Sequence, residues 1–250
     1  MNKSSNNETI NTIKHIIKIR AKELILSAII PIIVFTIGHA MLRLILHFDN
    51  ADDLTSFELG TVFTAFAIVL LTIVLGAINY SEHIKYAVSM GKRRRDFIIS
   101  NITLSFIKGI LASSLLFLFH TFEIYVLNTT YSHIPVEADF SPYFTPQLFL
   151  ALILIVMAVE NFMGAFAARF GLKVFWMIYT ILMFTYITIQ NFIISASEGT
   201  ATGIRKNIGE FLINIFSGMT FNTITMVLCC ISLVFVALPF LLLRKYRVDM

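Results

Sequence analysis

The sequence predicts an all-α integral membrane protein with six transmembrane helices and with its N- and C-termini in the cytoplasm. Six apolar stretches are long enough to cross the ~30 Å hydrocarbon core of a bilayer. They cover approximately residues 24–46, 59–79, 102–127, 147–168, 174–196 and 220–243. Hydrophobic residues make up 57% of the chain and charged residues only 14%, a composition that argues against a soluble domain. We therefore expect a single transmembrane domain over residues 1–250.

The basic residues predict the orientation of these spans. Fifteen of the nineteen Lys and Arg residues lie in the termini and in alternate connecting segments: Lys3, Lys14, Lys18, Arg20, Lys22, Lys85, Lys92, Arg93, Arg94, Arg95, Arg169, Lys173, Arg244, Lys245 and Arg247. The other connecting segments contain only Arg205 and Lys206. By the positive-inside rule, the basic segments face the cytoplasm. Their position at membrane boundaries suits anionic lipid headgroups, so the net charge of +4 does not indicate a nucleic-acid partner.

The first predicted element is a basic amphipathic helix over residues 8–23, which lies in the inner headgroup layer and leads into span one. Ile10, Ile13 and Ile17 recur at helical spacing, and basic or polar residues occupy the opposite face. The first apolar stretch is too long for a signal-peptide core, so we expect no cleaved signal peptide. Within span one, Arg43 is close enough to the outer end to extend its guanidinium to water.

The inner loop over residues 80–101, between spans two and three, has a pattern that a simple cluster of topogenic charges does not explain. Residues 82–90 can form a short helix, Gly91 is a plausible stop, and a run of four basic residues precedes Phe97. The positive-inside rule explains the four charges but not the other features of this loop. A short cytoplasmic helix that docks on a partner also explains the preceding helix, the glycine and the phenylalanine.

Spans three and four carry charges at similar depths. Lys108 is six residues from the inner end of span three, and Glu160, followed by Asn161, is eight residues from the inner end of span four. Charges within a span are costly and usually pair with one another or face a cavity. We expect either a buried Lys108–Glu160 pair or, as an equal alternative, a snorkelling Lys108 and a protonated Glu160 that bonds a neighbouring helix. Lys108, Glu160 and Asn161 are thus the candidates for an intramembrane charged pair or for residues that line a path through the membrane.

The remaining elements complete the six-span pattern. Small residues after Glu160 (Gly164, Ala165, Ala167 and Ala168) favour close helix packing in span four. A short basic turn over 169–173 leads into span five, and residues 197–219 contain an outer amphipathic helix. Cys229 and Cys230 are neighbours in span six and are best explained as small packing residues rather than metal ligands.

Enzymatic functions find little support in the sequence. No phosphate-binding GxxxxGK[ST] loop occurs, so any ATP and Mg²⁺ would be bound by a separate chain, and we expect no cofactor in this one. The two histidines within spans, His39 and His120, lack the Glu-x-x-His or His-x-x-x-His spacing of an intramembrane metalloenzyme, and no glycine-rich serine turn is present. We expect no catalytic or metal-binding residues. A membrane channel or a sensor subunit is compatible with these spans.

The order of these elements resembles the permease subunit of a bacterial ABC exporter of the ABC-2-like type. The inner loop AVSMGKRRRDFIISN is similar to the family's run of small turn residue, basic residues, aromatic residue and next span. The turn AARFGLKVFW is similar to the basic–glycine–basic turn that these permeases carry between spans four and five. The amphipathic helices before span one and between spans five and six also match. The resemblance covers essentially the whole chain, and its specificity lies in order and spacing.

This resemblance implies a half-transporter in the bacterial cytoplasmic membrane. Two six-span subunits, either two copies or paralogues, would form the substrate path, and each would be coupled to a separate ATPase subunit that binds ATP and Mg²⁺. The coupling helix would lie within residues 82–97, with Glu82, Tyr86, Met90, Gly91, Lys92, Arg93, Arg94, Arg95 and Phe97 as the candidate coupling residues. The substrates implied are peptides or other amphipathic compounds, as in export of, or resistance to, antimicrobial peptides.

Overall fold

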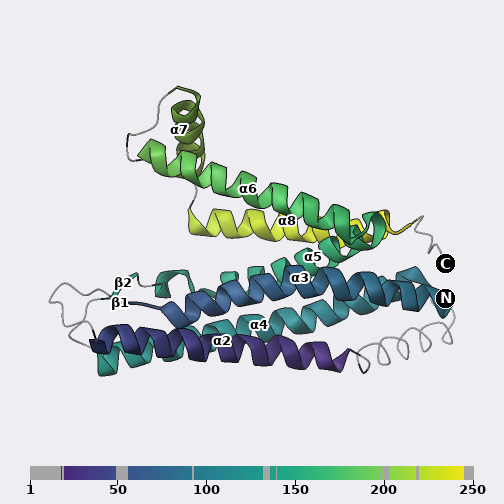
Figure 1. The fold of residues 1–250 in the computed structure, drawn as a ribbon, viewed down its shortest axis with the longest axis horizontal. Helices are drawn as coiled ribbons and strands as arrows, with labels where there is room; N and C mark the ends of the chain where they lie inside the picture. Colours follow the sequence, from purple (N-terminus) through teal and green to yellow (C-terminus); the bar gives the residue numbers. More distant parts are fainter. Residues whose placement is uncertain are drawn as a thin grey trace.

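A computed structural model gives the fold of this chain (Figure 1) and describes residues 18, 20–48, 56–91, 93–131, 136–138, 140–197, 199, 203–217 and 220–244. In this part of the chain, six helices are long and apolar enough to span a membrane, which indicates a multi-pass membrane protein. They are α2 (Ala21–Phe48), α3 (Leu59–Ser89), α4 (Arg94–Thr130), α5 (Pro146–Phe170), α6 (Leu172–Ser197) and α8 (Phe221–Leu242).

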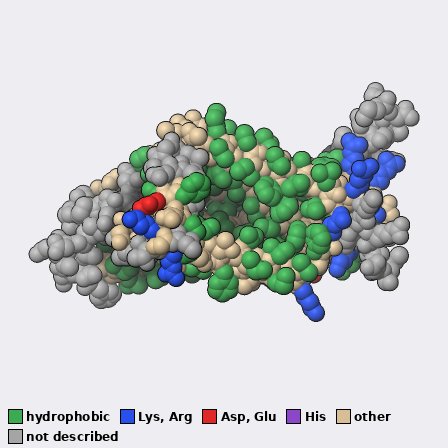
Figure 2. Space-filling view, turned by 90° about the horizontal axis from the view of Figure 1, so that it is seen from above, with side chains coloured by type: hydrophobic (Ala, Val, Ile, Leu, Met, Phe, Trp, Pro, Cys, Tyr) green, Lys and Arg blue, Asp and Glu red, His purple; other side chains and the backbone are tan. Residues whose placement is uncertain are grey.

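Shorter elements connect these helices at one end of the bundle. They are β1 (Ser56–Phe57), β2 (Val136–Ala138), the 3₁₀ turn η1 (Ser141–Tyr143) and α7 (Ile204–Ser217). The two strands pair in parallel. At the opposite end of the bundle, α2 begins and α8 ends, and the α3–α4 and α5–α6 turns lie there as well (Figure 1). We call this opposite end the basic end, because Lys and Arg side chains gather there beside an apolar middle (Figure 2).

The α3–α4 connection differs from the predicted loop over residues 80–101. Helix α3 continues without interruption to Ser89, and α4 already begins at Arg94. Residues 82–89, expected to form a short separate helix, are therefore the last part of α3, and buried Ile84 and Ala87 pack this part against the bundle. The predicted helical conformation of residues 82–90 is confirmed as far as Ser89, and so is the stop. Gly91 has φ +72°, a left-handed conformation that favours glycine.

Helices α3 and α4 also exceed the thickness of a membrane. The 31 residues of α3 correspond to ~46 Å and the 37 residues of α4 to ~55 Å, at ~1.5 Å per residue. A bilayer core of ~30 Å therefore leaves several turns of each helix outside it. The four consecutive basic residues at 92–95 suggest that most of the excess projects from the basic end.

Helix α5 lies at the centre of the bundle and packs against α3, α4, α6 and α8. Its small residues allow this close packing: a Cβ added at Gly164 would lie only 2.4 Å from Cγ of Tyr80 on α3. Ala165 and Ala167 are buried as well. The predicted small-residue face of span four is thus the surface that contacts α3.

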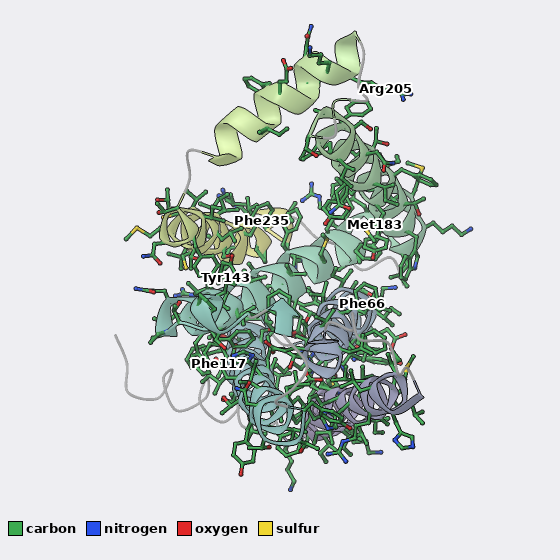
Figure 3. All side chains as sticks on the ribbon, turned by 90° about the vertical axis from the view of Figure 1, so that its left-hand side faces the viewer. Phe66, Phe117, Tyr143, Met183, Arg205 and Phe235 are labelled. Atoms are coloured by element: carbon green, nitrogen blue, oxygen red, sulfur yellow. The ribbon has the colours of Figure 1, made fainter. Side chains whose placement is uncertain are left out.

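Helices α6 and α8 are much less enclosed than α3–α5. Among the described residues of α6, only Phe175 is buried. Helix α7 packs against the end of α6, where a Cβ added at Gly209 would lie 2.5 Å from Cβ of Ala196. Away from the α5–α6 turn, α6 and α7 stand apart from the body formed by α2–α5 (Figures 1 and 3).

Candidate functional site

The centre of the candidate site is an ion pair between two helices. Lys108 on α4 places Nζ 2.7 Å from Oε1 of Glu160 on α5. Lys108 is 8% exposed and Glu160 is 1% exposed. Lys108 therefore does not extend to the headgroups, and the alternative of a snorkelling Lys108 is wrong. The two charges predicted to lie at similar depths are therefore in contact. Whether they line a substrate path stays a prediction.

Two residues at the start of α2 extend this pair. Glu23 places Oε2 3.0 Å from Lys108 Nζ, so that the ammonium bridges two carboxylates. Arg20 donates from Nε and Nη2 to the two carboxylate oxygens of Glu23, at 2.7 and 2.6 Å. The same guanidinium lies 3.6 Å from Glu160 Oε1. Two cations and two carboxylates thus form a neutral cluster at the inner part of the bundle.

Uncharged side chains complete this cluster. Asn101 on α4 accepts a hydrogen bond from Arg20 Nη1 and donates one from Nδ2 to Oδ1 of Asn161, at 2.8 Å. Asn161 in turn donates to the backbone carbonyl of Met157. Its predicted place along a substrate path stays a prediction. His83 on α3 places Nε2 3.0 Å from Glu23 Oε1. We refer to these residues as the inner charge network: Arg20, Glu23, His83, Asn101, Lys108, Glu160 and Asn161.

Sequence reasoning found three of these seven residues. It assigned Arg20 to the interfacial segment, but Arg20 is only 2% exposed because Glu23, Asn101 and Glu160 hold it inside the bundle. The available signal was the spacing of Arg20 and Glu23, opposite charges three residues apart on one helix face. Most of the predicted helix over residues 8–23 lies outside the described residues.

A second polar cluster lies at the other end of the bundle. Glu123 on α4 accepts hydrogen bonds from the backbone N–H groups of Gly60 and Thr61, at 2.9 and 2.7 Å, and therefore caps the first turn of α3. Next to it, His39 lies 3.6 Å from Glu123 and accepts a hydrogen bond from Arg43 Nε. The side chain of Arg43 was predicted to extend its guanidinium to water. Arg43 is exposed, which is consistent with that prediction.

The residue before α3, Glu58, also pairs in this region. Its carboxylate contacts His120 Nδ1 and accepts a hydrogen bond from the backbone N–H of Phe140. Burial raises the pKa of the Glu58 carboxyl above its usual range, and the contact with His120 partly opposes this rise. Among the described residues, no group of three His, Cys, Asp or Glu side chains is arranged to hold a metal ion.

The candidate coupling residues divide into an exposed and a buried set. Tyr86 and Met90 are 64% and 66% exposed. The candidates Glu82, Gly91, Arg93 and Arg95 are exposed too, as is the neighbouring Lys85. We call Glu82, Lys85, Tyr86, Met90, Arg93 and Arg95 the α3–α4 tip. Lys92 lies outside the described residues.

Phe97 and Arg94 have roles within the chain. Phe97 is 2% exposed and meets the ring of Tyr80 edge to face, with ring centroids 5.1 Å apart. Its predicted contact with a partner is therefore wrong for this conformation, because helix α4 begins before Phe97 and turns the ring into the core.

Arg94 donates from Nη1 to the backbone carbonyl of Arg244, at 3.1 Å, just beyond the end of α8. Arg169 similarly donates to the carbonyl of Leu242.

The chain was compared with protein-family models, with curated proteins and with solved structures. No family model, curated protein or solved structure matches it.

Proposed function

We propose that this chain is the permease subunit of an ATP-driven exporter of the ABC-2-like type, and that separate ATPase subunits bind at its α3–α4 tip. The observation that carries this proposal is the exposure of Tyr86 and Met90 at the end of a helix that is longer than the membrane is thick. Large apolar side chains that project beyond the bilayer are unfavourable unless another surface covers them.

The composition of the tip supports a protein partner. Lys85 and Tyr86 follow Glu82 by three and four residues, and Met90 follows Tyr86 by four, so these residues share one face of α3. Arg93 and Arg95, which are exposed at the start of α4, add positive charge at the same turn. An apolar centre with charged neighbours is typical of a docking site, in which aromatic and methionine side chains contribute contact area and arginines select an acidic partner.

The contact between His83 and Glu23 supports coupling of this surface to the membrane part. His83 lies on α3 directly beside Glu82 of the tip, and its ring reaches the carboxylate of Glu23 in the inner charge network. A partner that displaces the end of α3 would therefore disturb the pairing of Lys108 with Glu23. This arrangement suits a subunit that converts movement at its cytoplasmic end into rearrangement of its spans.

The open face of α6 and α8 supports a second six-span subunit. Aromatic side chains from α5, α6 and α8 line a groove there, including Phe166, Tyr179 and Phe235 (Figure 3 labels Phe235). We propose that another permease subunit, a copy or a paralogue, covers this groove, and that peptides or amphipathic compounds move between the two subunits. The expected location is a bacterial cytoplasmic membrane.

Co-purification tests the proposal. Tagged wild-type chain, extracted from its native membrane in mild detergent, should retain an ATPase that contains a P-loop, and the complex should hydrolyse ATP faster than that ATPase alone. Met90→Asp should abolish retention of the ATPase while membrane insertion is preserved, and Met90→Leu should restore it. Phe170→Asp is the matched control, because Phe170 is also exposed at the basic end but lies on the α5–α6 turn. Retention of the ATPase by the Met90→Asp variant, or retention of a kinase in place of an ATPase by the wild-type chain, would contradict the proposed exporter function.

A further inference from the structure

Three arginines from separate parts of the chain meet where α8 ends. Arg94, the first residue of α4, donates from Nη1 to the backbone carbonyl of Arg244, at 3.1 Å. Arg169, near the end of α5, donates from Nη1 to the backbone carbonyl of Leu242. These two carbonyls are only two residues apart, and the side chain of Arg244 starts at the same turn. We call Arg94, Arg169 and Arg244 the α8-end arginines.

The core of the bundle holds this turn of α8 in place. Leu243, which lies between the two carbonyl-bearing residues, is only 1% exposed. It belongs to one buried cluster with Ile84 of α3, Phe97 of α4 and Ala165 of α5. The end of α8 is therefore anchored beside the start of α4 and the end of α5. This anchor keeps the α8-end arginines together at the basic end, where Lys and Arg side chains gather (Figure 2).

Capping of α8 explains only part of this arrangement. The last carbonyls of a helix have no partner within the helix, and arginine side chains often donate to them. The two contacts use one N–H group of Arg94 and one of Arg169, whereas each guanidinium has five. The C-terminus of a helix contributes only about half a negative charge. Most of the positive charge of the α8-end arginines is therefore not balanced by the helix that they cap.

Carboxylates in the described part of the chain do not balance this charge either. None of the ion pairs formed among the described residues includes an α8-end arginine. Asp96, in the first turn of α4, forms no ion pair with a described residue. In the inner charge network, by contrast, both Arg20 and Lys108 contact carboxylates. The α8-end arginines therefore offer donors and positive charge to an anion.

An exposed apolar stripe on α8 leads away from these arginines. Leu241 is 66% exposed, and Val234 and Val227, seven and fourteen residues earlier, are 61% and 45% exposed. Side chains seven residues apart share a helix face, so the stripe is ~21 Å long at ~1.5 Å per residue. It is thus longer than one leaflet, which is about half of the ~30 Å hydrocarbon core. Phe235, in the groove proposed for the second subunit, lies ~120° around α8 from Leu241.

We propose that the α8-end arginines bind the phosphodiester headgroup of one anionic phospholipid, whose acyl chains lie along the stripe of Val227, Val234 and Leu241. The planar guanidinium matches the geometry of phosphate oxygens. Basic sites between helices at a membrane boundary are typical binding sites for such headgroups. The proposal is independent of the exporter function, because it concerns a single subunit and requires no ATPase.

Native mass spectrometry of delipidated protein in an uncharged detergent tests the site. The probes are phosphatidylglycerol and phosphatidylcholine with identical acyl chains, and inorganic phosphate as an anion without acyl chains. Phosphatidylglycerol should bind saturably and about tenfold more tightly than phosphatidylcholine, because the choline cation opposes the arginines. Millimolar phosphate should not displace the bound lipid, because it gains nothing from the apolar stripe. Equal binding of the two lipids, or displacement of the lipid by phosphate, would overturn the proposal.

One variant removes a guanidinium and keeps the backbone contacts. Arg244→Gln retains the carbonyls to which Arg94 and Arg169 donate. It should weaken binding of phosphatidylglycerol about fivefold, the effect of one basic side chain near a membrane surface. Lys22→Gln is the matched control, because Lys22 is an exposed basic residue at the same end of the bundle but lies on α2. Equal losses in the two variants would show a diffuse attraction to the whole basic end and would contradict a discrete site.

A second variant keeps the charge and changes only its shape. Arg169→Lys retains a donor for the Leu242 carbonyl but loses the planar guanidinium, so it should weaken binding of phosphatidylglycerol about threefold. This variant decides the question if Arg244→Gln does not fold. Wild-type affinity in the folded variants of Arg169 and Arg244 would show that the lipid binds elsewhere and that the inference is wrong.

Discussion

Lys108 on α4 and Glu160 on α5 form an ion pair of 2.7 Å in the interior of the bundle. Because Glu23 on α2 also contacts Lys108, the pair is the centre of a three-helix contact rather than an isolated bridge. Arg20 then supplies the second positive charge. The stability of the inner part of the bundle therefore depends on the balance among four charges.

This balance predicts a non-additive mutational cycle. Lys108→Met leaves two carboxylates with one cation, and Glu160→Gln leaves two cations with one carboxylate. Each single change should lower the free energy of unfolding by up to ~3–5 kcal/mol, the cost of an uncompensated buried charge. The double variant restores neutrality through Arg20 and Glu23 and should be less harmful than the sum. Thermal unfolding in detergent measures this cycle, and purely additive losses would show that the ion pair contributes no coupling.

The sequence predicted the membrane class, the six spans and the shared depth of Lys108 and Glu160, because hydropathy and charge patterns report these directly. It did not predict that Arg20 and Phe97 are buried. A residue at the end of a span can turn outward to the headgroups or inward to a partner on another helix, and the chain's own periodicity does not distinguish these cases. The continuation of α3 to Ser89 was missed for a related reason, since hydropathy detects the membrane-embedded part of a helix and not its extension into water.

The cap on α3 gives a second prediction. Glu123 is the acceptor for two backbone N–H groups that the helix itself cannot satisfy. Glu123→Leu should destabilise the protein by ~2–4 kcal/mol, because it leaves these donors and the Thr61 hydroxyl without their acceptor. Glu123→Gln retains one acceptor oxygen and should cost less. Thr121→Ala is the control, since Thr121 is an exposed neighbour that bonds only its own helix.

Close packing of α3 on α5 gives a third prediction. Gly164→Ala places a methyl group against the rigid ring of Tyr80, so one of the two helices must shift. We expect a loss of ~1–3 kcal/mol in the free energy of unfolding. Tyr80→Phe should cost little, because the buried Tyr80 hydroxyl has no hydrogen-bond partner among the described residues. A larger loss for Tyr80→Phe than for Gly164→Ala in thermal unfolding would contradict this packing.

The buried carboxyl of Glu58 predicts a pH dependence with a definite sign. Its pKa is raised in the folded protein, so the folded state holds this proton more tightly than the unfolded chain does. Stability from this group is fully present below the unfolded pKa of about 4.5 and is lost as the pH rises through the folded value. Glu58→Gln removes this titration and should flatten that part of the curve of melting temperature against pH. Parallel curves for the two proteins would show that Glu58 does not titrate in this range.

The charge asymmetry predicts which end of the bundle faces the cytoplasm. In a background without Cys229 and Cys230, single cysteines are introduced at Pro142, beside the α4–α5 connection, and at Ser89, at the α3–α4 tip. A membrane-impermeant maleimide added to intact cells should label Pro142→Cys and leave Ser89→Cys unlabelled until the membrane is permeabilised, because the basic end is retained inside. Arg205 and Lys206 on α7 are the main opposing charges, and their exchange for Gln should leave this labelling pattern unchanged. Labelling of Ser89→Cys from outside would reverse the topology and place the tip where no cytoplasmic ATPase can reach it.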